Sequence, residues 1–151
     1  MQSNKSFWAV FAVTSLAASI ASPANTAEIQ TVKVVERATT DVVTDIGDKG
    51  DSIGDILTFN NAVFDEANEK EIGRSDGHCI RTAVGQSWEC FWTLTLDDGQ
   101  ITVQGPFLDK GDSVLAVTGG TGAYAGVKGE MGLHARNPEA TEYDFNYSLS
   151  R

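Results

Sequence analysis

The most constraining feature of this sequence is its division into short runs in which β-branched and aromatic residues alternate with polar ones. Alternation with a period of two is typical of strands that bury one face, and no stretch after the N-terminal segment shows the spacing of an amphipathic helix. Glycine and aspartate separate the runs, as in Asp97-Asp98-Gly99 and Val84-Gly85-Gln86, where the chain can turn tightly. The pattern predicts eight strands, at about residues 31–38, 55–64, 77–84, 88–96, 100–107, 113–118, 127–134 and 142–149.

Many short strands joined by short turns predict an all-β fold, an antiparallel sandwich or barrel. Eight strands can close into a barrel whose interior is filled by side chains or holds one small ligand. Closure also removes the exposed strand edges that promote aggregation. We therefore expect an eight-stranded antiparallel β-barrel.

The N-terminal residues 1–27 have the pattern of a secretory signal peptide. Lys5 precedes the apolar stretch FWAVFAVTSLAASIA, and small residues up to Ala27 offer cleavage sites. The stretch is too short and too rich in alanine and serine for a membrane span, and no later segment approaches the length of one. We expect a secreted or periplasmic protein with one domain over residues 28–151.

The chain has a formal net charge of −10, which argues against nucleic acid as a partner because phosphate backbones repel an acidic protein. The charge favours solubility. Calcium binding is the alternative, because four aspartates lie in turn-like segments, at Asp48, Asp51, Asp109 and Asp112. Their spacing does not match an EF-hand loop, so we favour solvated turns. His78 and His134 are isolated, and we expect neither a metal site nor a cofactor.

The two cysteines flank one predicted hairpin turn at nearly equal distances. In a tight hairpin Cys79 and Cys90 would face each other on the same side of the sheet. An oxidising compartment would favour a disulfide between them, and two buried free thiols are the alternative.

The segment TGGTGAYAG, residues 118–126, fits the dinucleotide pattern G-x-G-x-x-[GA]. That pattern binds pyrophosphate only when a helix follows the glycines within a βαβ unit. The following VKGEMGLHAR has no helical apolar stripe, and only 25 residues remain after Gly126. We therefore interpret TGGTG as a glycine turn between two strands.

Three parts of the sequence resemble one known family. ITVQGPFLDKGDSVLAVTGGTGAYAGVKGEMGL, residues 101–133, is similar to the C-terminal half of plant allene oxide cyclases, and GDILTFNNAVFD (54–65) and IGRSDGHC (72–79) match upstream parts in the same order. The dirigent proteins of the same superfamily share the GD-x-L and GGTG pieces. The resemblance implies a small eight-stranded barrel with an apolar cavity, and a homotrimer or homodimer.

The resemblance also implies a function and three catalytic candidates. Allene oxide cyclases fold a reactive lipophilic intermediate and steer its ring closure, and dirigent proteins orient phenolic intermediates. Glu36 matches a glutamate that stabilises positive charge, Asn61 an asparagine that helps hold a water, and Cys79 a cysteine near the reacting double bonds. Two positions depart from the family, because an asparagine is replaced by Ala38 and a proline by Asp45.

Strand alternation adds candidate substrate-binding residues. A glutamate in a strand usually faces solvent, but the resemblance implies that Glu36 points inward, on the same face as Val34 and Ala38. Arg81 has the same parity as Cys79, so it could pair with Glu36 inside the barrel, or face water if the hairpin is bulged. The other candidates are Trp88 and Trp92, as pocket or core wall, and Pro106 of the VQGPF motif.

Three functions remain open at this stage. The first is guidance of the cyclisation or coupling of a small lipophilic or phenolic substrate in the cavity. The second is a non-catalytic barrel that binds an apolar small molecule, and the third is a structural barrel filled by side chains. Hydrolysis is not favoured, because the sequence has no recognisable nucleophile–base arrangement.

Overall fold

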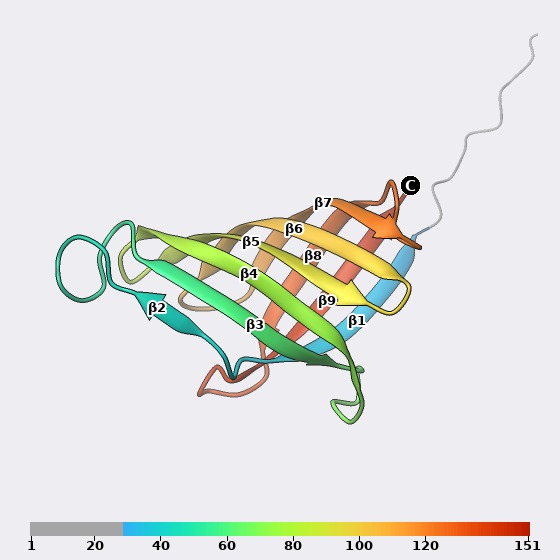
Figure 1. The fold of residues 1–151 in the computed structure, drawn as a ribbon, viewed down its shortest axis with the longest axis horizontal. Coiled ribbons are helices and arrows are strands. Elements are labelled where there is room, and N and C mark those ends of the chain that lie inside the picture. The colour runs from blue at the N-terminus through green and yellow to red at the C-terminus, as the bar shows by residue number, and fades with distance from the viewer. Residues whose placement is uncertain (1–28) are drawn as a thin grey trace, which may run out of the picture.

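The described part of the chain forms a closed antiparallel β-barrel (Figure 1). In the computed structural model, which describes residues 29–151, the strands are β1 (Gln30–Arg37), β2 (Val42–Thr44), β3 (Ile56–Phe64), β4 (Glu71–Ala83), β5 (Ser87–Leu96), β6 (Gly99–Leu108), β7 (Ser113–Gly122), β8 (Lys128–Ala135) and β9 (Glu142–Ser150). No helix occurs between residues 29 and 151. The predicted all-β barrel is confirmed, and the predicted signal peptide lies outside the described residues.

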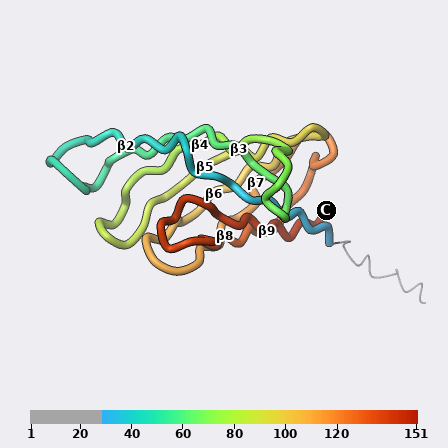
Figure 2. The backbone as a smooth tube through the Cα atoms, turned by 90° about the horizontal axis from the view of Figure 1, so that it is seen from below, coloured from blue at the N-terminus to red at the C-terminus, as the bar shows by residue number. Residues whose placement is uncertain are grey.

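The barrel closes through a short pairing between β1 and β3. Neighbouring strands pair in the order β1-β9-β8-β7-β6-β5-β4-β3-β2, and residues 35–37 of β1 pair with residues 62–64 of β3. The chain leaves the barrel after Arg37, and β2 then pairs with the other half of β3. Eight strands therefore form the barrel, and β2 is a short additional strand that the sequence did not predict. In both views the loop after β2 projects from one end (Figure 2).

Strand β4 is longer than the sequence predicts, because glycines that usually weaken a strand are part of it. The predicted start was residue 77, and the strand begins at Glu71. At Gly77 a Cβ atom would lie 2.3 Å from the Cβ of Trp92 on the neighbouring strand. Gly77 therefore gives room to the Trp92 side chain inside the barrel and does not end the strand.

The TGGTG segment is also different from its predicted structure. Residues 118–122 continue β7, with a bulge opposite Thr102 and Val103, and the turn itself is formed by residues 123–126. The prediction of a turn at TGGTG was therefore wrong in position, although the segment does connect two antiparallel strands and begins no helix.

Tyr124 in this turn closes one end of the barrel. Its side chain is 4% exposed and belongs to the hydrophobic core, and its hydroxyl lies 3.5 Å from Asp98 Oδ2 in the β5–β6 turn. The turn can fold back because Gly120 has no side chain, since a Cβ there would lie 2.5 Å from the carbonyl oxygen of Tyr124. Large apolar side chains fill this end of the interior, among them Leu94, Ile101, Val117, Met131 and Leu149.

The opposite end carries the long connection between β2 and β3. Asp55 holds this loop, because its carboxylate accepts hydrogen bonds from the backbone N–H groups of Ile46 and Ser52. The backbone of Arg81 on β4 then binds the loop, accepting from Gly54 N and donating to Asp55 O. Tyr124 thus closes one end of the barrel. The loop between β2 and β3 borders the opposite end (Figure 1).

We expect Gly120→Ala to destabilise the protein by about 1–3 kcal/mol, because a side chain there overlaps two backbone carbonyl groups. Urea unfolding measures the change. The matched control is Gly119→Ala, whose Cβ would contact only Thr102 Oγ1 at 3.6 Å. Equal stability changes for the two variants would show that the close approach at Gly120 is not what limits this position.

Candidate functional site

A small cavity lies inside the barrel near the end that carries the long loop. Its volume is about 40 Å³. The lining is mainly apolar and aromatic with two acids, and consists of Glu36, Asp41, Leu57, Phe59, Cys79, Cys90, Trp92, Phe107, Leu133, Tyr143 and Phe145. These side chains come from seven strands and from the segment after β1. Pockets for drug-sized ligands have roughly 300–1,000 Å³, so a larger substrate needs some of these side chains to move.

The cavity walls are flat aromatic rings. Trp92 stacks on Phe145 with ring centroids 5.5 Å apart, and Phe59 meets Trp92 edge to face at 6.0 Å. Phe107 and Tyr143 form a second edge-to-face pair at 5.9 Å, and both are only partly buried. Rotation of this second pair is the simplest way in which the cavity can enlarge.

Glu36 is the buried acid of the cavity. It lies near the end of β1, where alternation turns it to the same side as Val34, and it is 5% exposed. Asn61 Nδ2 donates to Glu36 Oε1 at 3.3 Å, whereas Oε2 has no protein partner. The inward orientation predicted for Glu36 is confirmed.

Burial raises the pKa of Glu36 from 4.5 to about 7. Loss of hydration disfavours the charged form, and the negative charge of Asp41 acts in the same direction. The side chains of Ser75 and Asn61 oppose the shift. Glu36 therefore changes its charge near neutral pH, which is the range in which an acid is useful for catalysis.

Asn61 acts inside the protein and has no obvious capacity left for a substrate. Its Oδ1 accepts from the backbone N–H groups of Thr39 and Thr40 and from the Thr40 hydroxyl, at 2.9–3.1 Å. Its Nδ2 donates to Asp41 at 2.8 Å and to Glu36. Asn61 thus ties the segment that leaves the barrel to the buried acid, so it is a positioning residue.

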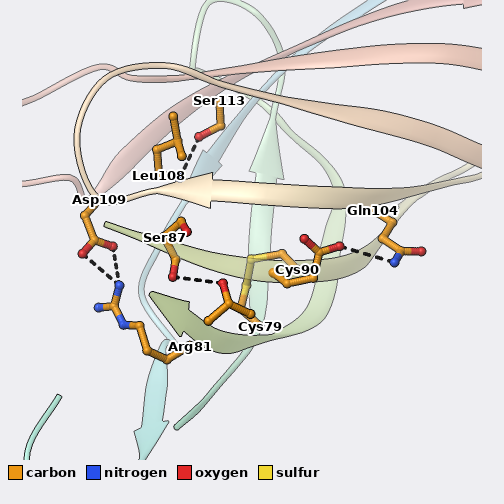
Figure 3. The surroundings of a disulfide bond; sticks show 10 residues. Cys79, Arg81, Ser87, Cys90, Gln104, Leu108, Asp109 and Ser113 are labelled. Atoms are coloured by element: carbon orange, nitrogen blue, oxygen red, sulfur yellow. Dashed lines mark hydrogen bonds and ion pairs between the residues drawn. A yellow bond between two sulfur atoms is a disulfide. The ribbon is translucent and has the colours of Figure 1, made fainter. Parts of the chain in front are cut away.

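Cys79 and Cys90 form a disulfide, as the hairpin predicted (Figure 3). They are direct partners across β4 and β5, with Cα atoms 4.0 Å apart, and both line the cavity. The bond leaves neither cysteine as a free thiol. The role of Cys79 as a catalytic thiol is therefore excluded in this state, and the sulfur atoms serve as apolar cavity wall.

Arg81 does not pair with Glu36, so that prediction was wrong. Its guanidinium lies 2.6 Å from the carboxylate of Asp109 (Figure 3). It also lies 2.7 Å from the carboxylate of Asp51 and 4.0 Å from the centre of the Trp88 ring. Neither Arg81 nor Trp88 lines the cavity. Arg81 instead holds the long loop and the β6–β7 turn at the rim of the barrel, and Trp88 packs against its guanidinium. A bulge follows Arg81, yet the residue is buried and does not face water.

Among the remaining candidates, Trp92 lines the cavity and Pro106 does not. Pro106 is exposed on the outer face of β6, and the following residue, Phe107, points inward. The parity that Phe107 shares with Ile101 and Val103 could have identified it. Tyr143 was also missed, although its parity matches the buried Phe145 and Tyr147. Burial, with the nearby charges of Asp41 and Glu36, raises the pKa of Tyr143 to about 12.

The described residues offer no obvious place for a metal. Between residues 29 and 151, no group of three or more histidine, cysteine, aspartate or glutamate side chains is arranged to hold an ion. His134 pairs with Asp112 at 2.7 Å on the surface, which raises the pKa of the histidine. In the same part of the chain no helix is long and apolar enough to cross a membrane.

The sequence profile of allene oxide cyclases matches residues 22–145. The chain belongs to the allene oxide cyclase family. This match includes every strand from β1 to β8 and all residues of the cavity, so the family resemblance seen in the sequence is confirmed.

Solved structures show the same barrel in proteins with different printed activities. A pyocyanin demethylase is 26% identical, with a TM-score of 0.70, over 80% of this chain and 99% of its own. A pterocarpan synthase dirigent protein has a TM-score of 0.70 at 12% identity, over 87% and 96% of the two chains. An exo-specific intermolecular Diels-Alderase has a TM-score of 0.64 at 15% identity, over 82% and 99%. The last two likenesses establish the fold alone.

The raised pKa of Glu36 predicts that stability falls as pH rises. Between about pH 4.5 and 7 the folded chain holds a proton that the unfolded chain has released, so ionisation favours unfolding. The loss is absent below pH 4.5 and complete above pH 7, and amounts to about 3 kcal/mol. Denaturant unfolding of the wild type and Glu36→Gln across this range should show the two curves diverging, with the variant gaining relative stability. Parallel curves would contradict a raised pKa for this carboxyl.

We expect Asn61→Ala to destabilise the protein by about 3 kcal/mol, because it leaves several partly buried donors of Thr39 and Thr40 without their acceptor. Chemical denaturation measures the difference. Asn60→Ala is the matched control. Asn60 is the preceding residue on β3, is exposed, and accepts a hydrogen bond from Arg74 on the outer face. If Asn61→Ala lowered the free energy of unfolding no more than the control does, the positioning role of Asn61 would be contradicted.

Proposed function

We propose that this protein is an exported barrel that binds a small lipophilic or phenolic reactive intermediate and guides its stereoselective cyclisation or coupling. The observation that carries the proposal is Glu36, a 95% buried carboxyl with one unpartnered oxygen inside an aromatic-lined cavity. An acid in such a position costs stability, and groups of this kind are common where they serve catalysis.

The aromatic walls would restrict the conformation of the bound intermediate. Reactions of this type proceed readily once the reacting atoms approach in one orientation, so confinement by flat rings contributes both rate and stereochemistry. Trp92 and Phe145 offer a continuous stacked surface for a planar or unsaturated substrate, and Phe107 and Tyr143 would move to admit it.

The carboxylate of Glu36 would stabilise positive charge that develops during bond formation. In an apolar cavity a fixed charge acts more strongly than in water, because few solvent dipoles oppose it. Asn61 orients the carboxyl, and the disulfide gives a rigid wall without a reactive thiol. The ionised form is needed for this role, so guidance should strengthen as pH rises through about 7.

Two further observations support the proposal. The related structures carry printed names of proteins that transform small organic molecules, including a pyocyanin demethylase, a pterocarpan synthase and a Diels-Alderase. Export is supported by the disulfide, which is typical of oxidising compartments, together with the signal-peptide pattern of residues 1–27. Assembly into a homotrimer or homodimer stays a prediction.

The cavity volume of about 40 Å³ favours a second candidate function, a structural barrel filled by its own side chains. A protein of this kind would bind no small apolar molecule and would leave product stereochemistry unchanged. The two candidates are therefore separated by the same experiment.

That experiment supplies a racemic allene oxide, or a mixture of coupling phenolic radicals, and measures the enantiomeric excess of the product by chiral chromatography. We expect an excess with the wild type, an increase from pH 6 to pH 8, and loss of that pH dependence in Glu36→Gln. The matched control is Glu89→Gln, which removes an exposed carboxylate from the outer face of β5. Racemic product at every pH with both substrate classes would favour the structural barrel.

A further inference from the structure

The cavity lining contains a pair of acids without a positive partner. Asn61 Nδ2 donates both to Glu36 Oε1 at 3.3 Å and to Asp41 Oδ1 at 2.8 Å, so the two carboxyl groups lie close together. Among the described residues, the lining holds no lysine, arginine or histidine. Arg81 lies outside it, paired with two other carboxylates at the rim. Two adjacent negative charges repel each other, and a bound cation would remove that repulsion.

Aromatic rings lie beside the acid pair. Tyr143 is the direct cross-strand partner of Glu36, and the charges of Glu36 and Asp41 help to raise its pKa to about 12. Phe107 meets Tyr143 edge to face, with ring centroids 5.9 Å apart. Both rings are only partly buried, and Asp41 is exposed, so a ligand can reach this part of the cavity from solvent. We call Glu36, Asp41, Phe107 and Tyr143 the acidic end of the cavity.

An organic cation fits the acidic end better than a metal ion does. Calcium takes about six to eight oxygen ligands, whereas two carboxyl groups and aromatic rings meet here. A primary ammonium group has several N–H donors that need acceptors, and Asn61 Oδ1 already accepts from Thr39 and Thr40. A quaternary ammonium group has no N–H donor and is attracted both by carboxylates and by the faces of aromatic rings.

We propose that the acidic end of the cavity binds the quaternary ammonium group of a small molecule whose remaining part is apolar. The inference rests on the proposed function, because it names a class of substrate for the same cavity, one that carries positive charge beside Glu36. It assigns Asp41, Phe107 and Tyr143 to substrate recognition, although the sequence indicated none of the three as a site residue.

The test compares choline with 3,3-dimethyl-1-butanol, in which a carbon atom replaces the charged nitrogen of choline. The two probes have nearly the same shape, and each gives a single methyl signal that ¹H NMR follows during titration with the protein. At pH 8 we expect choline to bind about tenfold more tightly. Its methyl signal should also move upfield on binding, because protons held close to ring faces are shielded by the ring currents.

Binding of choline should strengthen as pH rises, because a cation favours the ionised form of Glu36, whose pKa is about 7. Burial raises the pKa values of Tyr143 and Tyr147 above their usual range, so both stay neutral. The side chains that act on Glu36 or respond to its charge are Asp41, Asn61, Ser75, Tyr143 and Tyr147. We expect about a threefold or larger gain in choline affinity from pH 6 to pH 8, and a constant affinity for 3,3-dimethyl-1-butanol.

Variants assign the effect to the acidic end. Asp41→Asn keeps an acceptor for Asn61 and removes the charge, so it should lower choline affinity about threefold or more and leave that of 3,3-dimethyl-1-butanol unchanged. Glu36→Gln should lower choline affinity similarly and abolish its pH dependence. Tyr143→Leu should weaken choline binding and reduce the upfield shift, and Tyr143→Phe, which keeps the ring, should restore both.

The matched control is Glu89→Gln, which makes the same change in net charge on the outer face of β5. It should leave the choline preference, the upfield shift and the pH dependence as in the wild type. A loss of choline affinity in this control equal to that in Asp41→Asn would show general attraction to an acidic protein and would overturn the proposal. Thermal melts verify that all the variants fold.

Equal affinities for the two probes in the wild type, or binding of neither, would also overturn the proposal. So would a choline affinity that Asp41→Asn leaves unchanged while its melting temperature falls, since Asp41 would then act only in the structure. The probes undergo no reaction, so the result is independent of catalysis. A choline preference with racemic products would refute only the cyclisation proposal, whereas enantiomeric excess without the preference would refute only the cation site.

Discussion

The side chain of Asn61 makes five hydrogen bonds, and both the closure of the barrel and the position of the acid in its cavity depend on them. The chain must leave the barrel after Arg37, because β3 pairs with β1 along one half and with β2 along the other. That departure exposes backbone donors that no strand can satisfy, and the Asn61 side chain accepts from two of them. The same amide group fixes Glu36. A single buried side chain thus connects closure of the sheet with orientation of the acid.

The two ends of the barrel differ, because one is closed by apolar side chains and the other ends in a rim of anchored loops. At one end the turn of residues 123–126 folds inward, and Tyr124 with its apolar neighbours excludes water. At the other end Arg81 is surrounded by Asp51, Asp109 and Trp88, and it holds the loop and the β6–β7 turn as a rim. A buried guanidinium is tolerable there because both carboxylates compensate its charge. The cavity can therefore open towards only one end.

The interior combines groups that favour stability with groups that oppose it. The aromatic cluster around Trp92 and the disulfide stabilise the fold, and the disulfide does so mainly by restricting the unfolded chain. Glu36 acts against folding, since its hydration is lost without full replacement. A barrel selected only for stability would place an apolar residue at this position.

The sequence alone determined the fold class, most strand positions and the disulfide. These features follow from local rules, namely alternation, turn residues and the symmetry of a hairpin. The inward direction of Glu36 was expected only from the family resemblance, because alternation alone does not decide which face of a strand is buried. The tertiary structure alone decided the partners of Arg81, the outward position of Pro106 and the length of β4. Each depends on side chains far apart in the chain. From the sequence, Gly77 is expected to weaken a strand, but in the fold it makes room for the side chain of Trp92 on the neighbouring strand. Arg81 has the parity expected of a partner for Glu36, but the folded loops place Asp51 and Asp109 beside it instead.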